Sequence, residues 1–351
     1  MKQSTYLKVI FFGSSNYCIP ILDSLNKNYH LIAILTKPNS KVQEFAKTHH
    51  IKFFTPQDKN ELFGLKDKVI QRKPDLAIVA DYGLIIPSDI FNLPKYKTLN
   101  IHFSKLPDLR GPSPVQYTIL RGDNSAWISI IIMSEVMDTG DYIWQKEIRT
   151  FDNQQLTINN ETSDSLYKKL FNIVAVELPN VISKYVQKEL RPIKQDHSKA
   201  TYTKILTRDD GFIPPHILSV ILSPDFKSER SIPLEAPKTK GILRFVQDDN
   251  WSMFIDRAIS AFTPWPELWT EVYLTKGLKT PGRWPNDSFQ VEESEKTEKK
   301  RLKILKAHTE QTTNNKQRIT KLVISVVQLE GKKPVSWKQF KEGYPNFSFL
   351  N

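Results

Sequence analysis

The first half of the chain alternates short apolar runs with segments that mix polar and apolar residues. Five apolar runs, most of them rich in β-branched or aromatic residues, predict buried strands: residues 8–12, 31–35, 76–80, 98–103 and 127–133. Between the second and third runs, residues 41–49 have the spacing of an amphipathic helix. Strands that alternate with helices form βαβ units. The pattern therefore predicts an α/β fold with a mostly parallel sheet.

A long helical pattern followed by a polar stretch marks the end of this first domain. Apolar residues recur near helical spacing over residues 163–186, with Pro179 as an interruption. The residues that follow carry charges of both signs and include Pro192, which is the composition of a linker. We therefore predict a first domain over residues 1–186 and a linker over residues 187–206.

The second half of the chain has a different pattern. Three short strand-like runs follow a helical segment at 253–262, namely residues 268–274, 302–307 and 322–327. Short strands behind one helix predict a small β-barrel or sandwich domain over residues 207–351. Within this domain, residues 214–249 interrupt the approach to the helix, and we predict that they form an inserted surface segment.

Composition narrows the class of protein. The 351 residues are 39% hydrophobic, which suffices for a sizeable core, and the single cysteine, Cys18, excludes an intramolecular disulfide framework. The apolar runs are far shorter than the roughly 20 residues that span a bilayer. Residues 1–12 lack the pattern of a secretion signal. We therefore expect a cytoplasmic protein with no membrane partner.

The net charge of +12 is unevenly distributed along the chain. Residues 1–186 hold 22 Lys and Arg against 18 Asp and Glu, a net +4, whereas residues 187–351 hold 28 against 20, a net +8. A basic half fits a polyanionic partner, but a solvated basic surface explains the same excess. Charge alone therefore leaves tRNA, other RNA and anionic lipid open as partners.

Candidate catalytic residues lie on and just beyond the fourth and fifth predicted strands. Asn100 and His102 are two residues apart on a strand, so their side chains point to the same face. An amide that polarises a carbonyl beside an imidazole that moves protons fits an acyl-transfer site. A third group is needed to orient the imidazole, and the turn past the next strand offers two carboxylates, Asp138 and Asp141.

Each of these residues also has a structural interpretation. A histidine at a strand end is more often structural, and an Asp-Thr-Gly-Asp sequence is common in turns. Their joint arrangement, with Pro107 and Arg110-Gly111 between them, favours a site. A metal site is not expected, because the seven histidines show no ligand spacing beyond His49-His50. The chain also lacks the Gly-x-Ser-x-Gly elbow of a serine hydrolase.

The residues around this constellation resemble a known signature. The sequence Asn-Ile-His at 100–102, Ser-Lys-Leu-Pro at 104–107, Arg110-Gly111 and Asp-Thr-Gly-Asp at 138–141 resembles the signature of formyltransferases that use 10-formyltetrahydrofolate. This resemblance implies a Rossmann-like catalytic domain with a mostly parallel sheet.

The second half carries a narrower resemblance. The run Phe-Thr-Pro-Trp-Pro at 262–266 and the tail at 327–334 are similar to the second domain of the methionyl-tRNA formyltransferase branch. With gaps, the likeness covers most of residues 6–213 and 250–345. It implies an OB-like β-barrel that binds tRNA.

The resemblance also implies a role for each matching residue. Asn100 would hydrogen-bond the formyl oxygen, His102 would stabilise the developing oxyanion and move a proton, and Asp138 would orient His102. The co-substrate would be 10-formyltetrahydrofolate and the acceptor would be the amino group of methionyl-initiator-tRNA. The enzyme would act in translation initiation as a monomer without a metal. Nine residues of two loops would line the folate site: Tyr82, Gly83, Leu84, Ile85 and Pro87, with Ser104, Lys105, Leu106 and Pro107.

The chain departs from the family pattern in three respects. The basic loop that usually follows the second strand is missing at residues 36–40. Trp127 stands where glycine is usual, and Lys105 replaces a leucine, from where it can reach the glutamate tail of folate or lie in solvent. Residues 214–249 have no counterpart in the family.

These departures keep alternative functions open. The missing basic loop favours an amino-sugar N-formyltransferase with the same donor, whereas the two-domain pattern and the basic second half oppose it. Glycinamide ribonucleotide formylation fits less well, because that branch lacks a second domain. A catalytically silent RNA-binding protein is the alternative from another class, and the joint presence of Asn100, His102 and Asp138 argues against it.

Overall fold

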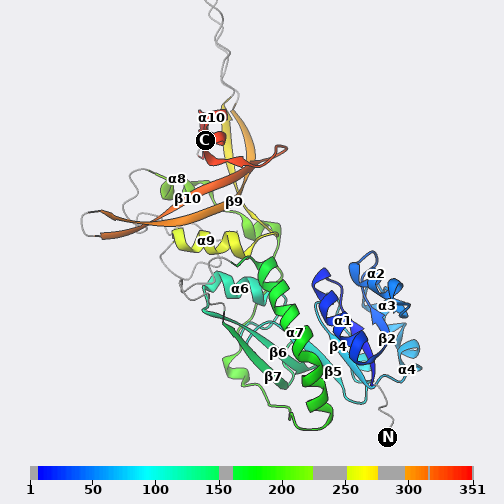
Figure 1. Ribbon diagram of the computed structural model, residues 1–351. Coiled ribbons are helices and arrows are strands. Elements are labelled where there is room, and N and C mark those ends of the chain that lie inside the picture. Colours follow the sequence, from blue (N-terminus) through cyan, green and yellow to red (C-terminus); the bar gives the residue numbers. More distant parts are fainter. Residues whose placement is uncertain (1–6, 150–160, 224–250, 276–296, 315–316, 350–351) are drawn as a thin grey trace, which may run out of the picture. The chain divides into compact units, whose positions relative to one another are not determined.

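The computed structural model describes residues 7–149, 161–223, 251–275, 297–314 and 317–349 (Figure 1). The chain divides into two compact units. The first comprises Met1–Thr118 and Asp123–Ile205, and the second comprises Ile119–Gly122 and Leu206–Asn351. Within the described ranges, no helix combines the length and the apolar character that crossing a membrane requires.

The first unit is built on a seven-stranded sheet with the order β3-β2-β1-β4-β5-β6-β7. The neighbours from β3 to β5 pair in parallel, and β6 and β7 extend one edge in antiparallel pairing. The strands are β1 (Lys8–Phe12), β2 (His30–Leu35), β3 (Phe53–Phe54), β4 (Leu76–Val79), β5 (Thr98–His102), β6 (Ser125–Ile132) and β7 (Tyr142–Arg149). The predicted α/β fold with a mostly parallel sheet is confirmed.

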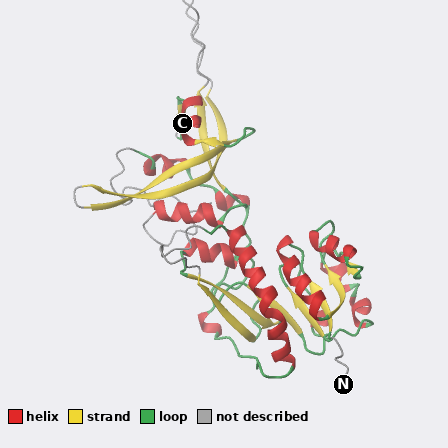
Figure 2. Ribbon diagram, in the orientation of Figure 1, coloured by secondary structure: helices red, strands yellow, loops and turns green. Residues whose placement is uncertain are grey.

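Helices flank this sheet (Figure 2). The helices of the first unit are η1 (Asn16–Cys18), α1 (Ile19–Asn28), α2 (Lys41–Thr48), α3 (Lys59–Phe63), α4 (Lys66–Ile70), α5 (Ser88–Phe91), α7 (Ser163–Val186) and η2 (His197–Lys199), and α6 (Pro114–Arg121) begins in the first unit and ends in the second. The helix predicted from apolar spacing over residues 163–186 is α7. Its first turn is capped by Thr162, whose side chain accepts a hydrogen bond from the backbone N–H of Ser165.

Pro179 lies inside α7 without ending it. A proline has no N–H, so the carbonyl four residues earlier, that of Ala175, loses its helical donor. The hydroxyl of Ser24 on α1 donates to that carbonyl at 2.6 Å. One turn further on, the hydroxyl of Tyr29 donates to the carbonyl of Pro179 at 3.1 Å. The hydrogen bond from Ser24 on α1 therefore compensates for the interruption.

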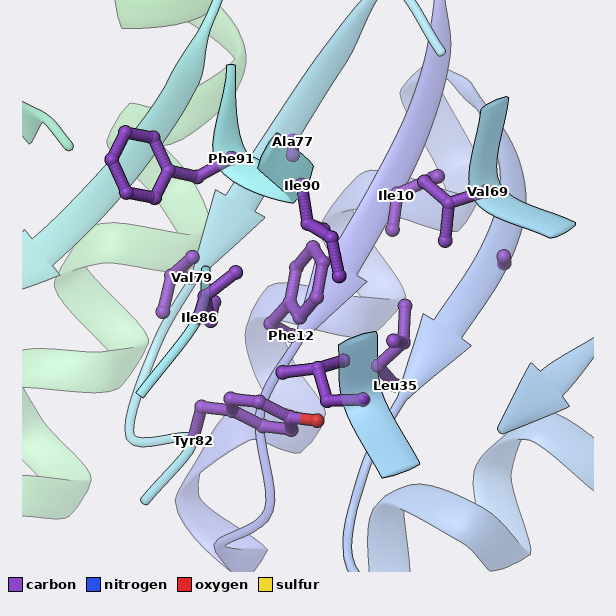
Figure 3. Packing of buried hydrophobic residues seen from close by; sticks show 12 residues of the cluster. Ile10, Phe12, Leu35, Val69, Ala77, Val79, Tyr82, Ile86, Ile90 and Phe91 are labelled. Atoms are coloured by element: carbon purple, nitrogen blue, oxygen red, sulfur yellow. The ribbon is translucent and has the colours of Figure 1, made fainter. Parts of the chain in front are cut away.

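The core of the first unit gathers around β1. Ile10 and Phe12 are almost fully buried, as expected of a central strand that is covered on both faces. On one face they pack with residues of the neighbouring strands and of the segment after β4 (Figure 3). The ring of Tyr82 meets that of Phe12 edge-on, with centroids 5.4 Å apart. This core fixes the positions from which the loops beyond β4 and β5 start.

The segment predicted to be a linker packs against the first unit. Ile193 and Tyr142 exchange two backbone hydrogen bonds, at 2.9 and 3.0 Å. Arg110 pairs with the same segment, because its N–H donates to the carbonyl of Thr201 and its own carbonyl accepts from the N–H of Thr203. Backbone hydrogen bonds thus hold the segment that was predicted to be a linker against the first unit.

The second unit contains a five-stranded sheet with the order β11-β10-β9-β8-β12, in which the neighbouring strands are antiparallel. Its strands are β8 (Leu268–Thr275), β9 (Thr297–Asn314), β10 (Gln317–Leu329), β11 (Val335–Ser336) and β12 (Phe347–Ser348). Its helices are η3 (Arg208–Gly211), α8 (Pro215–Ile221), α9 (Trp251–Ala261) and α10 (Trp337–Gly343). A separate small β domain is present as predicted, and its OB-like closure stays a prediction.

The predicted insertion at 214–249 begins within the packed part of the second unit. Residues 215–221 form α8, and Ile217, Leu218 and Ile221 are almost completely buried. Burial of three apolar side chains makes α8 part of the core, in contrast to the surface segment that the odd composition predicted. Residues 224–249 of the predicted insertion lie outside the described residues.

Candidate active site

The C-terminal half of β5 presents Asn100 and His102 on one face. The strand register sets Asn100 opposite Ile131 and His102 opposite Ser129 of β6. His102 is 6% exposed, whereas Asn100 is half-buried. Alternation along the strand therefore brings an amide and an imidazole side by side, as the sequence predicts.

The loop between β6 and β7 places Asp138 against both side chains. Asp138 Oδ1 accepts a hydrogen bond from Asn100 Nδ2 at 3.2 Å, and Asp138 Oδ2 accepts one from the N–H of Gly111 at 2.8 Å. His102 Nδ1 lies 3.6 Å from Asp138 Oδ2. The structure thus brings together the three predicted catalytic residues, with the carboxylate between the amide, the imidazole and a backbone donor.

Tight packing holds this loop. A Cβ atom added to Gly140 would lie 1.7 Å from the carbonyl oxygen of Ile132, so only glycine fits at that position. The backbone of Asp141 also pairs with this residue, because its carbonyl accepts from the N–H of Ile132 at 2.9 Å. Asp138 itself adopts a left-handed backbone, with φ of 57°.

His102 lies between two hydrogen-bond acceptors. Its Nε2 is 2.9 Å from the carbonyl oxygen of Leu109, and its Nδ1 faces the carboxylate of Asp138. An imidazole that carries both protons donates from both nitrogens. These contacts hold the ring next to the amide of Asn100, an arrangement that suits proton transfer at a carbonyl group.

Polar side chains of β6 and β7 hydrogen-bond the backbone of the loop after β5. The Ser129 hydroxyl donates to the carbonyl of Ser104 at 2.6 Å and accepts from the N–H of Leu106 at 3.3 Å. Gln145 Nε2 donates to the carbonyl of Leu106 at 3.0 Å and to the Ser129 hydroxyl at 2.9 Å. Ser104 and Leu106 are buried, and the peptide bond between Leu106 and Pro107 is cis.

Two unusual residues of this region contact each other. Lys105 is exposed, and its Nζ lies 4.4 Å from the centre of the Trp127 ring, within the range of a cation–π interaction. Trp127 lies within β6, where it pairs with Glu147 of β7. The tryptophan is thus accommodated in a regular strand, and the lysine rests on its ring.

Comparison with known proteins assigns the chain to a family. A sequence profile described as formyl transferase matches residues 7–175. The methionyl-tRNA formyltransferase of Bacillus cytotoxicus is 33% identical over 220 residues, which are 58% of this chain and 66% of that protein. The methionyl-tRNA formyltransferase of Sulfurihydrogenibium sp. is 30% identical over 219 residues, which are 59% of this chain and 68% of that protein. The chain belongs to the formyl transferase family. It spans about two thirds of the length of these relatives.

A solved structure extends the likeness in fold beyond the family domain. The N-formyltransferase from Helicobacter canadensis, in complex with folinic acid and dTDP-3-aminofucose, has a TM-score of 0.55 and 15% identity. The match covers 91% of this chain and 98% of that chain. At this identity it shows a shared fold.

In the loop after β4, some of the residues predicted to line the folate site are buried and others are exposed. Tyr82 points into the core, and burial raises the pKa of its hydroxyl above its ordinary value (Figure 3). Leu84 packs against the same core, whereas Ile85 is 66% exposed. Gly83 has a φ of 81°, and Pro87 precedes the first turn of α5. The side chains of Tyr82 and Leu84 therefore pack into the core, whereas Gly83 and Ile85 are exposed.

Sequence reasoning missed several residues that shape the site. Ser129 and Gln145 lie within strands. Only the direction of their side chains, toward the loop after β5, could have identified them as part of the site. Arg110 stands in the quoted signature without a role, and Gln195 falls in the predicted linker, yet both are buried. In the described parts of the chain, no group of three or more His, Cys, Asp and Glu side chains is arranged to hold a metal ion.

Proposed function

We propose that this chain transfers a formyl group from 10-formyltetrahydrofolate to the amino group of methionyl-initiator-tRNA. The observation that carries the proposal is the joint placement of Asn100, His102 and Asp138 in a chain at least 30% identical to curated methionyl-tRNA formyltransferases. The substrate follows those relatives, and the cytoplasmic location and role in translation initiation follow from the substrate.

The site residues have distinct roles in this reaction. The Asn100 amide carries two hydrogens, of which one is donated to Asp138, so the second is available to the formyl oxygen. His102 donates a proton where negative charge develops or where the folate nitrogen leaves. Asp138 orients both side chains and balances the charge of the protonated ring. None of these steps requires a metal.

The residues around the site fit a folate donor. The bound donor supplies the formyl group. The loop after β4 offers backbone groups at Gly83 and the exposed Ile85, and the loop after β5 is fixed by Ser129 and Gln145. Lys105 lies over Trp127, and from this exposed position its ammonium can pair with the carboxylates of the donor's glutamate tail.

A substrate panel tests the proposed function. The full chain is supplied with 10-formyltetrahydrofolate and is offered methionyl-initiator-tRNA, the same tRNA carrying another amino acid, or amino-sugar nucleotides. We expect N-formylmethionyl-tRNA as the product. Turnover of the amino sugars without turnover of the tRNA would establish the alternative acceptor, and absence of turnover with every acceptor would contradict formyl transfer altogether.

The Asn100→Ala variant tests the role of the amide. Loss of one donor to a developing oxyanion typically lowers kcat by about 10²–10³-fold, and we expect a loss of that size. Steady-state kinetics with methionyl-tRNA measure it. Asn92→Ala is the matched control, because Asn92 is an exposed residue at the end of α5. A kcat for Asn100→Ala close to that of the control would remove Asn100 from the mechanism.

A further inference from the structure

A buried polar network contacts the loop that carries Asp138. The guanidinium-bearing residue Arg110 is 2% exposed, and Gln195 is 5% exposed. A buried charge is tolerated only where hydrogen bonds satisfy it. Arg110 Nε and Nη2 donate to Gln195 Oε1 at 3.2 and 2.7 Å, and Nη2 also donates to His197 Nδ1 at 2.8 Å. Gln195 and His197 therefore supply acceptors to Arg110, and the Tyr202 hydroxyl accepts from Nη1 at 3.5 Å.

The orientation of the Gln195 amide follows from its partner. A guanidinium only donates, so the amide oxygen must face Arg110 and the NH₂ group must point the other way. Gln195 Nε2 donates to the carbonyl of Asp138 at 2.8 Å and to the carbonyl of Gly140 at 2.6 Å. One buried side chain thus connects Arg110 to the backbone of the loop that carries Asp138.

The same segment holds the other neighbour of His102. The N–H of Leu109 donates to Thr201 Oγ1 at 2.8 Å, and the carbonyl of Leu109 is the acceptor 2.9 Å from His102 Nε2. A Cβ atom on Gly111 would lie 2.6 Å from the carbonyl oxygen of Thr203, so this segment approaches the Arg110 loop closely. Residues 195–203 therefore contact both loops that flank the imidazole.

Both flanking residues have strained backbones. Asp138 and Leu109 have φ angles of 57° and 55°, in the left-handed region, which is unfavourable for residues other than glycine. Such conformations persist where surrounding contacts determine them. Hydrogen bonds from Gln195 and Thr201 are among the contacts that do so here.

We propose that Gln195 is a positioning residue for the proposed formyl transfer: it fixes the Asp138 loop, and with it the distance between the Asp138 carboxylate and the His102 ring. This inference rests on the proposed function for its kinetic consequence. Its structural consequence, a change in the surroundings of the His102 ring, holds whatever the acceptor is. Displacement of a reacting group by about 1 Å can cost about 10²-fold in rate.

Gln195→Glu is the sharpest variant. A glutamate keeps an acceptor for Arg110 but replaces the NH₂ group with a carboxylate oxygen, so the hydrogen bonds to Asp138 and Gly140 are lost and a negative charge faces both carbonyls. We expect kcat to fall by about 10–100-fold while the KM values for tRNA and folate change less than about threefold. The matched control is Gln187→Glu, the same substitution at an exposed position that ends α7.

A spectroscopic measurement separates positioning from general loss of structure. In ¹⁵N-labelled protein without substrates, the imidazole nitrogen resonances of His102 report the hydrogen bonds of its ring. We expect these resonances to shift in Gln195→Glu and to stay unchanged in Gln187→Glu, with the two variants alike in far-ultraviolet circular dichroism. Because this measurement needs no turnover, it decides the inference even if the proposed function fails.

A second variant covers the case in which Gln195→Glu does not fold. Gln195→Met removes the same NH₂ group without adding a charge, and it should shift the same resonances and lower kcat. The inference is overturned if a folded Gln195→Glu protein keeps the His102 resonances of the unsubstituted chain, or if only KM changes. If the Gln195→Glu protein does not fold, Gln195→Met decides by the same criteria.

Discussion

At the scale of single residues, Cys18 shows how burial suppresses a nucleophile. Its side chain is fully buried, and its Sγ donates to the carbonyl of Ala80 at 3.3 Å. Burial raises the pKa of the thiol to about 12, and the charge of Asp81 acts in the same direction. Because the thiolate is the reactive form, this raised pKa leaves very little reactive thiol at pH 8.

We therefore expect Cys18 to resist a disulfide reagent such as dithionitrobenzoate in the native protein at pH 8. In guanidinium chloride one thiol per chain should react within seconds to minutes. The absorbance of the released thiolate measures both rates. Native labelling as fast as that of the unfolded chain would show that the thiol is accessible.

Sequence could predict some residues of the site and not others, for physical reasons. Asn100 and His102 follow from strand alternation, which acts over two residues and can be read directly from the chain. Asp138 needed the resemblance, because its contact with them spans a loop. Gln195 lies 57 positions from Asp138, its partner in a hydrogen bond, and nothing in the polar composition around it distinguishes a buried amide from a solvated one.

At the scale of elements, a side chain of α1 replaces a hydrogen bond that α7 lacks. Ser24→Ala leaves the Ala175 carbonyl, already without a helical donor because of Pro179, with no replacement from α1. We expect α7 to be destabilised by about 1 kcal/mol. Native-state hydrogen exchange of the amides of α7 measures this free energy locally, whichever way the rest of the chain unfolds.

A double-mutant cycle identifies the cause. In a Pro179→Ala background, the restored N–H can bond the Ala175 carbonyl, so Ser24→Ala should then cost less than in the unsubstituted chain. Ser183→Ala, at an exposed position of the same helix, serves as control. Equal costs of Ser24→Ala in both backgrounds would show that the hydroxyl contributes by another route.

Elements were predicted best where apolar residues alone define them. The spacing over residues 163–186 matches α7, because a buried helix face needs periodic apolar side chains. In the second unit, the apolar runs at 302–307 and 322–327 marked only the centres of β9 and β10, which span 18 and 13 residues. Polar residues extend these strands by backbone pairing, which a hydrophobic pattern does not register.

At the scale of the whole molecule, the chain combines two units of different construction. The first joins parallel strands through helices, and the second pairs strands in an antiparallel sheet. The net charge of +8 over residues 187–351 includes residues 187–205, which belong to the first unit. The basic excess assigned to a tRNA-binding domain is therefore shared between the units, and the proposed tRNA contacts need not come from the second unit alone.

The two units should also respond separately to a core substitution. Leu218 is fully buried in α8, which packs against β8, so Leu218→Ala should leave a cavity and destabilise the second unit by about 2–5 kcal/mol. Hydrogen exchange followed by mass spectrometry should show faster exchange in peptides from β8 and α9, and unchanged exchange in peptides from β1 and β5, whose core is their own. Val220→Ala, at a half-exposed position of the same helix, should have a much smaller effect. Because the odd composition of residues 214–249 predicted a surface segment, this comparison also tests where that segment begins. If hydrogen exchange is as slow in the Leu218→Ala protein as in the Val220→Ala protein, α8 is not part of the core.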